Sequence, residues 1–149
     1  MDGLDDTFDH YLGQCRALLD RGVDDTVLCR RLAPDMDEAG FHLAVAMRFA
    51  ARAVAPMEAP DIPSEYTQAA LRTYADDIAG FRAGRTTGDL TGPVHHVAGE
   101  AELTQDPQDF LLRFALPNMI FHLSVAYAVA RSAGVPLGKA DFDGLHVYR

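Results

Sequence analysis

The sequence has 149 residues, which is enough for one domain with a substantial hydrophobic core. Its formal net charge of −9 argues against nucleic acids and anionic membranes as partners, because both repel an acidic surface. The two cysteines, Cys15 and Cys29, have no metal-type spacing and make no disulfide framework, so we expect a reduced, cytoplasmic protein.

The chain begins with an amphipathic helix that we expect from about residue 5 to residue 21. Apolar residues recur there at spacings of three and four, and Gly22 supplies a helix end. Asp24 or Asp25 can cap a short second helix. This piece must stop near Pro34, because the residue before a proline avoids the helical conformation.

The next predicted helix starts at Asp35 and runs over about residues 36–55. His42 lies seven residues before Phe49, nearly in line with it on one helix face, so we expect His42 to face inward. Residues 56–63 contain three prolines and cannot be helical, and they are too long for a tight turn. They predict a long crossover connection between two helices.

A third long helix is predicted with Ser64 as its cap and with its end near residues 82–84. Residues 86–104 contain glycines, a proline and short β-branched runs, which favour a loop with a small hairpin. His95 and His96 are adjacent in this stretch. In a strand they would point to opposite faces, so they cannot bind one metal ion together.

The last long helix is the segment around which we expect the chain to be organised. Asp106 can cap it, Pro107 fits its first turn, and Gly134 follows its end. Its apolar stripe is interrupted by Asn118 and His122, which lie one turn apart on the same face. Any chemistry of this protein is expected to involve this polar pair.

Pro117 removes a backbone donor just before the polar pair, so we expect a kink in the helix there. Four long helices with one long crossover predict an all-α protein, a four-helix bundle that forms a single domain over residues 1–149. The last helix is apolar almost all the way round, which is more than one bundle core can cover. We therefore expect a homodimer.

Three motifs carry a resemblance that covers nearly the whole chain. They are RLAPDM at residues 31–36, FALPN and the following FH at residues 114–122, and GVPLGKADF at residues 134–142. In this order and spacing they resemble an uncharacterised bacterial branch of the DinB/YfiT-like superfamily of candidate metalloenzymes. The resemblance implies a DinB-like four-helix bundle in up-down-down-up order, often assembled as a dimer. Some superfamily members are thiol-dependent transferases or isomerases.

The wider superfamily binds a divalent metal through one histidine on the second long helix and an H-x-x-x-H pair on the last. By this resemblance His42 matches the first ligand and His122 the last, whereas Asn118 stands where the third histidine would be. An asparagine carbonyl is a weak ligand for zinc or nickel, which favour His, Cys and carboxylates. We therefore expect no metal, or a weakly bound zinc or nickel ion whose shell is completed by water or Glu38.

Three functions remain open from the sequence. The first is a hydrolase- or transferase-like enzyme in which His42 and His122 are metal ligands, or general bases if no metal binds. The second is a catalytically silent pocket for a small apolar molecule. In the third, Asn118 and His122 form a buried polar pair that only specifies helix register, and the protein acts through its dimer surface.

Overall fold

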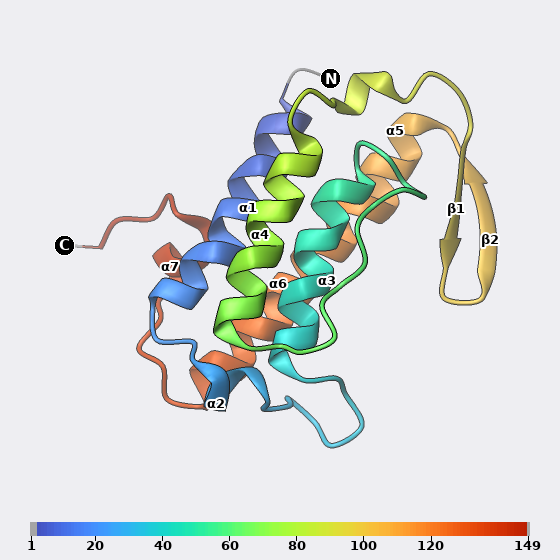
Figure 1. Ribbon diagram of the computed structural model, residues 1–149. Helices are drawn as coiled ribbons and strands as arrows, with labels where there is room; N and C mark the ends of the chain where they lie inside the picture. Colours follow the sequence, from blue (N-terminus) through green and yellow to red (C-terminus); the bar gives the residue numbers. More distant parts are fainter. Residues whose placement is uncertain (1–2, 149) are drawn as a thin grey trace.

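The computed structural model of the protein describes residues 3–148, and Figure 1 shows four long helices packed side by side. These are α1 (Leu4–Asp20), α3 (Ala39–Arg52), α4 (Gln68–Arg82) and α6 (Leu116–Ser132). Shorter pieces connect them: α2 (Asp25–Leu28), a 3₁₀ turn (Thr87–Asp89), α5 (Pro107–Asp109), a π-helical segment (Phe110–Ala115) and α7 (Lys139–Asp143).

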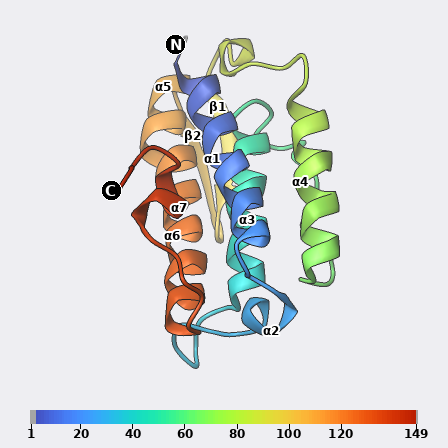
Figure 2. The same ribbon diagram turned by 90° about the vertical axis from the view of Figure 1, so that its left-hand side faces the viewer.

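The directions of the four long helices confirm the predicted bundle. In Figure 1, α1 runs down, α3 and α4 both run up, and α6 runs down again. The two parallel helices, α3 and α4, are joined by the extended connection over residues 53–67, which returns along the length of the bundle. Figure 2 shows α6 at the left and α4 at the right, with α1 in front of α3 between them.

A two-stranded antiparallel hairpin precedes the last helix, as expected. It consists of β1 (Val94–Ala98) and β2 (Ala101–Gln105), with His96 opposite Leu103. His95 is exposed and His96 is buried, so the two neighbours do point to opposite faces of the hairpin.

The core lies mainly between α3 and α6, which make the most extensive contact between two helices. Small side chains allow the two backbones to approach, and several alanines are fully buried there. At the contact, Ala39 of α3 clusters with Val125 and Val129 of α6. Other buried residues of the two helices include Leu43, Ala46, Met47 and Ala50 on α3, and Met119, Leu123, Ala126 and Ala130 on α6. The packing of α6 against α3 thus accounts for much of its apolar surface.

By length and composition alone, Pro107–Ser132 could also cross a membrane, since its mean hydropathy is 1.3. The core helix of a globular protein passes the same test, and 39% of this window is buried inside the bundle. The finding is therefore weak evidence for a membrane span.

Two predicted helix starts were wrong, each because tertiary hydrogen bonds place the true start. The helix expected from Asp35 begins at Ala39, whose N–H donates to the carbonyl of Arg30 at 2.8 Å. The chain before it is held in a turn by a bridge between Arg31 and Glu38. Glu38 occupies the cap position, but its side chain makes no cap hydrogen bond.

The helix expected to be capped by Ser64 is instead capped by Thr67, whose hydroxyl oxygen accepts from the N–H of Ala70 at 3.1 Å. The Gln68 side chain reaches across and donates to the carbonyl of Leu19 at 2.7 Å. Its own N–H donates to Asp25 at 2.7 Å. These contacts fix where α4 begins, and a propensity argument could not include them.

The irregularity predicted at Pro117 takes the form of the π-helical segment just before it. In this stretch the backbone is wound more widely than in an α-helix, and α6 begins with Pro117 in its first turn. The Asn118 side-chain amide donates to the carbonyl of Phe114 at 2.8 Å, which spans the junction of the two helical forms.

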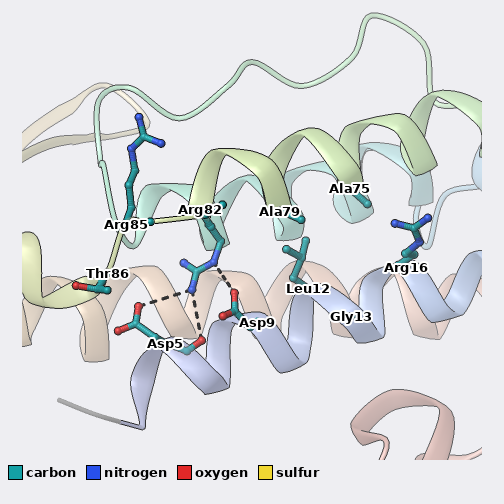
Figure 3. Close-up of a pocket in the computed structure, with 12 residues that line it drawn as sticks. Asp5, Asp9, Leu12, Gly13, Arg16, Ala75, Ala79, Arg82, Arg85 and Thr86 are labelled. Atoms are coloured by element: carbon teal, nitrogen blue, oxygen red, sulfur yellow. Dashed lines mark hydrogen bonds and ion pairs between the residues drawn. The ribbon is translucent and has the colours of Figure 1, made fainter.

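Arg82 of α4 forms hydrogen bonds to both α1 and α3, and so links three long helices at one end of the bundle. Its side chain is 5% exposed, and it donates to Asp9 on α1 at 2.7 Å and to the carbonyl of Ala50 on α3 at 2.7 Å. Figure 3 shows it reaching from α4 to Asp5 and Asp9. Asp5 in turn accepts from the N–H and hydroxyl of Thr87, at 2.9 Å each.

The groove around Arg82 has a volume of about 570 Å³ and runs between α1 and α4. Its floor is made of small residues, among them Gly13, Ala75 and Ala79. Because the buried Arg82 side chain pairs with Asp9 and Asp5 and also bonds to the α3 backbone, we interpret this cluster as a structural clamp.

Replacing Arg82 with Ala is expected to lower the free energy of unfolding by about 2–3 kcal/mol, because it removes the buried partner of Asp9 and Asp5. Replacing Arg16, which pairs with Asp76 on the exposed surface, should cost less than about 1 kcal/mol. Urea unfolding of both variants measures the difference. Equal losses would show that Arg82 is not the clamp.

Candidate functional site

His42 on α3 and His122 on α6 lie side by side where the two helices pack. The Nδ1 atoms of the two rings are 2.9 Å apart, and the ring centroids are 5.1 Å apart. His42 is 4% exposed, whereas His122 is half-buried. The two histidines singled out in the sequence are therefore brought together, although 80 residues separate them along the chain.

The short distance between the Nδ1 atoms defines how the pair is protonated. One Nδ1 must carry a hydrogen and donate it to the lone pair of the other, because two N–H groups or two bare lone pairs would repel. The Nε2 atom of His42 is buried and has no hydrogen-bond partner among residues 3–148. An unsatisfied buried nitrogen costs free energy, so the site holds a polar atom that the protein itself leaves unsatisfied.

The surroundings keep both imidazoles neutral at pH 7. Burial and, to a smaller extent, the neighbouring His42 lower the pKa of His122 to about 4, while Asp37 acts in the opposite direction. Burial also lowers the pKa of His42, an effect that the negative charge of Asp37 opposes. Each neutral imidazole has one nitrogen lone pair, and the hydrogen bond between the rings uses one of the two, so one lone pair stays available at neutral pH.

Aromatic rings surround the histidines. The ring of Phe49 stacks on His122 with centroids 6.1 Å apart, and Phe41 lies edge-on to His42 at 5.6 Å. Phe121, which is 54% exposed, lies edge-on to His122 at 5.1 Å. The site is thus a polar pair within an apolar rim that is partly open to solvent.

Asn118 does not join the two histidines. It is half-buried, and its amide donates to the carbonyl of Phe114 one turn earlier. The hydrogen bond expected between Asn118 and His122 in the buried-pair interpretation is not formed. His122 bonds to His42 instead, so the polar contact links two helices rather than two turns of one helix.

The described residues do not fit the three-ligand metal centre that the resemblance implies. Among residues 3–148, no group of three or more His, Cys, Asp or Glu side chains is placed to hold a metal ion. Two imidazoles supply only part of a protein-bound zinc site, which normally uses at least three strong ligands. Their Nδ1 atoms also satisfy one another directly.

The sequence pattern of the family described as "Domain of unknown function (DUF1993)" matches residues 5–143. The chain belongs to this family. Among solved structures, the chain is similar to the crystal structure of a DinB family member protein from Shewanella denitrificans, at 27% sequence identity and a TM-score of 0.81. The match covers 99% of this chain and 93% of the other, and it confirms the predicted resemblance and bundle. A search of curated proteins finds no significant match.

In this DUF1993 domain the two hairpin histidines lie outside the pair. His95 bonds to the hydroxyl of Thr104 at 2.8 Å on the exposed face. His96 contacts the side-chain carbonyl of Gln105 at 2.7 Å, and its ring packs against Phe114 with centroids 4.3 Å apart. His96 therefore anchors the hairpin to the segment that leads into α6.

Arg52, at the end of α3, is the residue near the site that sequence reasoning missed. Its guanidinium lies 5.1 Å from the centre of the Phe49 ring and 5.0 Å from that of Phe114, and it donates to the carbonyl of Val97 at 3.0 Å. The sequence did hold a signal, because Arg52 follows Phe49 at helical spacing.

The depressed pKa values predict that the DUF1993 domain loses stability in acid. An unfolded histidine binds a proton near pH 6.5, while folded His122 resists protonation down to about pH 4. Stability from this residue is therefore complete above pH 6.5 and is lost as the pH falls from 6.5 towards 4. The loss should be about 2 kcal/mol, allowing for partial exposure.

The comparison that isolates this effect is urea unfolding of the wild type and of His122→Gln at pH 7.5 and pH 4.5. The variant has no titrating group at this position, so its stability should fall less. An equal fall in both proteins would show that His122 is not held neutral by the fold.

Proposed function

We propose that the DUF1993 domain binds a small molecule at the His42–His122 pair and moves a proton there in a hydrolase- or transferase-like reaction. The observation that supports this most is the hydrogen-bonded, neutral pair between α3 and α6, with a buried nitrogen left unsatisfied. A purely structural pair would have no need for that unsatisfied atom. Perturbed, buried titratable groups of this kind are typical of functional sites.

The half-buried His122 is the group that meets the ligand in this proposal, and His42 positions it. The hydrogen bond between the two Nδ1 atoms fixes the orientation of the His122 ring. Its low pKa makes His122 a weak base that is always unprotonated at neutral pH. In hydrolysis His122 takes a proton from water as that water adds to the ester carbonyl and the alkoxide or phenolate leaves; the proton can be shared along the bond, and the negative charge of Asp37 stabilises it.

A neutral ester, p-nitrophenyl acetate, tests whether the pair promotes proton transfer. We expect hydrolysis above the background rate, with His122→Gln and His42→Gln lowering the excess rate about tenfold or more. The excess should stay constant from about pH 6 to pH 8, because His122 is already unprotonated.

The matched control is His95→Gln, which removes an exposed histidine from the outer face of the hairpin and should leave the rate unchanged. Equal excess rates in all three variants would overturn the proposed role of the pair.

We also propose that the reaction proceeds without a tightly held metal ion. Two histidines and a weak asparagine are a poor ligand set for zinc or nickel. Protein purified without a histidine tag should therefore contain well under one metal ion per chain. Zinc or nickel should raise the melting temperature only at high concentration, since a weak ligand stabilises only when present in excess.

Elemental analysis and thermal-shift titrations measure both quantities. Stoichiometric metal that survives dialysis against a chelator, and that is lost in His42→Ala and His122→Ala, would contradict this proposal.

Homodimerisation stays a prediction. Leu112, at 44% exposure, and Phe121, at 54%, are large apolar side chains left at the surface on the helical stretch over residues 107–132. A second copy of the domain is our proposed partner for this surface.

A further inference from the structure

Arg52 carries a positive charge that the protein leaves uncompensated. The other buried or half-buried arginines all pair with a carboxylate: Arg48 with Asp61, Arg72 with Asp20, and Arg82 with Asp9. Arg52 is half-buried as well, but no carboxylate among residues 3–148 lies within ion-pair distance of it. In a chain with 22 acidic and 13 basic residues, such a gap is unexpected.

The hydrogen-bonding capacity of Arg52 is also largely unused. A guanidinium has five N–H donors in a planar fork, and within the described part of the chain only the bond from Nη2 to Val97 is formed. The faces of Phe49 and Phe114 stabilise the cation without occupying these donors. Burial and the positive charge of Arg48 lower the pKa of Arg52, because no nearby carboxylate stabilises its charged form.

Phe49 connects this cation to the histidine pair. The Phe49 ring stacks on His122, and the guanidinium of Arg52 lies 5.1 Å from the centre of the same ring. Phe49 itself is only 6% exposed, so a molecule bound at Arg52 would meet the half-buried Phe114, whose ring the guanidinium also contacts. This arrangement suits a ligand with an anionic end and an apolar body.

We infer that the ligand of this site carries a carboxylate, which Arg52 binds, and an apolar or aromatic body that packs against Phe114, beside the buried Phe49 ring that contacts His122. The inference rests on the proposed function and names its substrate class. A carboxylate matches the planar fork of one arginine through two parallel hydrogen bonds. A phosphate dianion would call for more positive charge than one arginine supplies, because Arg48 is already neutralised by Asp61.

Benzoate and its neutral analogue benzamide are the probes that separate charge from shape. Binding is measured by calorimetry and by the NMR signals of the histidine rings. We expect benzoate to bind the wild type more tightly than benzamide and to shift the signals of His122. Arg52→Gln should weaken benzoate binding about tenfold or more, the worth of a charge-assisted hydrogen bond, and should leave benzamide binding unchanged.

Two further variants keep the result interpretable. Arg52→Gln retains an amide that can donate to Val97, so the hairpin contact need not be lost, and circular dichroism checks the fold. Arg52→Lys keeps the charge and should retain part of the binding. The matched control is Arg85→Gln, since Arg85 lies on the Phe81 ring at 4.3 Å, donates to the Phe81 carbonyl, and is remote from the pair.

Undetectable benzoate binding to the wild type, or equal binding in Arg52→Gln, would overturn the inference. If only this fails, the histidine variants still lose hydrolysis of the neutral ester, and the proposed function stands. If hydrolysis is unaffected by the histidine variants while Arg52→Gln loses benzoate, the carboxylate site stands and the proton-transfer role of the pair is wrong.

Discussion

The close contact between α3 and α6 is the interaction on which the rest of the structure depends. Buried alanines on both helices let the two backbones approach, and this approach brings His42 and His122 within hydrogen-bonding distance. A larger side chain at one of these positions would separate the helices and break the polar contact together with the apolar one. Core packing and the candidate site are therefore one feature of the bundle.

Aromatic side chains next to this contact shield the pair from part of the solvent. The pair is enclosed by Phe41, Phe49 and Phe121, and the hairpin is held nearby by His96 and Arg52. Electrostatic interactions strengthen as water is excluded. Under the proposed function, this shielding would let the neutral pair and the Arg52 guanidinium discriminate between ligands more sharply than the same groups on an open surface.

Local signals predicted those parts of the fold that local chemistry decides. Asp106 does cap the helical stretch that begins at Pro107, and its carboxylate accepts from the N–H of Asp109 at 3.1 Å. The starts of α3 and α4 were misplaced because they depend on Arg30 and Gln68, whose partners are distant in sequence. Helical spacing and the family resemblance identified His42 and His122.

Asn118, the third member of the proposed set, was assigned by analogy; its side-chain amide bonds across the helix junction, and its role as a metal ligand stays a prediction. Arg52 and Arg82 were missed for a common reason. A sequence shows that an arginine lies near an apolar stripe, but only the packed structure shows whether a carboxylate meets it. Arg82 forms ion pairs with Asp5 and Asp9, whereas Arg52 forms no ion pair with a carboxylate among the described residues.

The π-helical segment over Phe110–Ala115 also determines how the chain can tolerate changes in length. Its wider winding holds one residue more than an α-helical turn would need. Losing a residue here can be absorbed by tightening the segment, which leaves His122 facing α3. An added residue cannot be absorbed by tightening the segment. It would rotate the hairpin and α6 relative to each other by about 100°. Among related chains, this stretch is therefore a place where shortening is compatible with an intact site and lengthening is not.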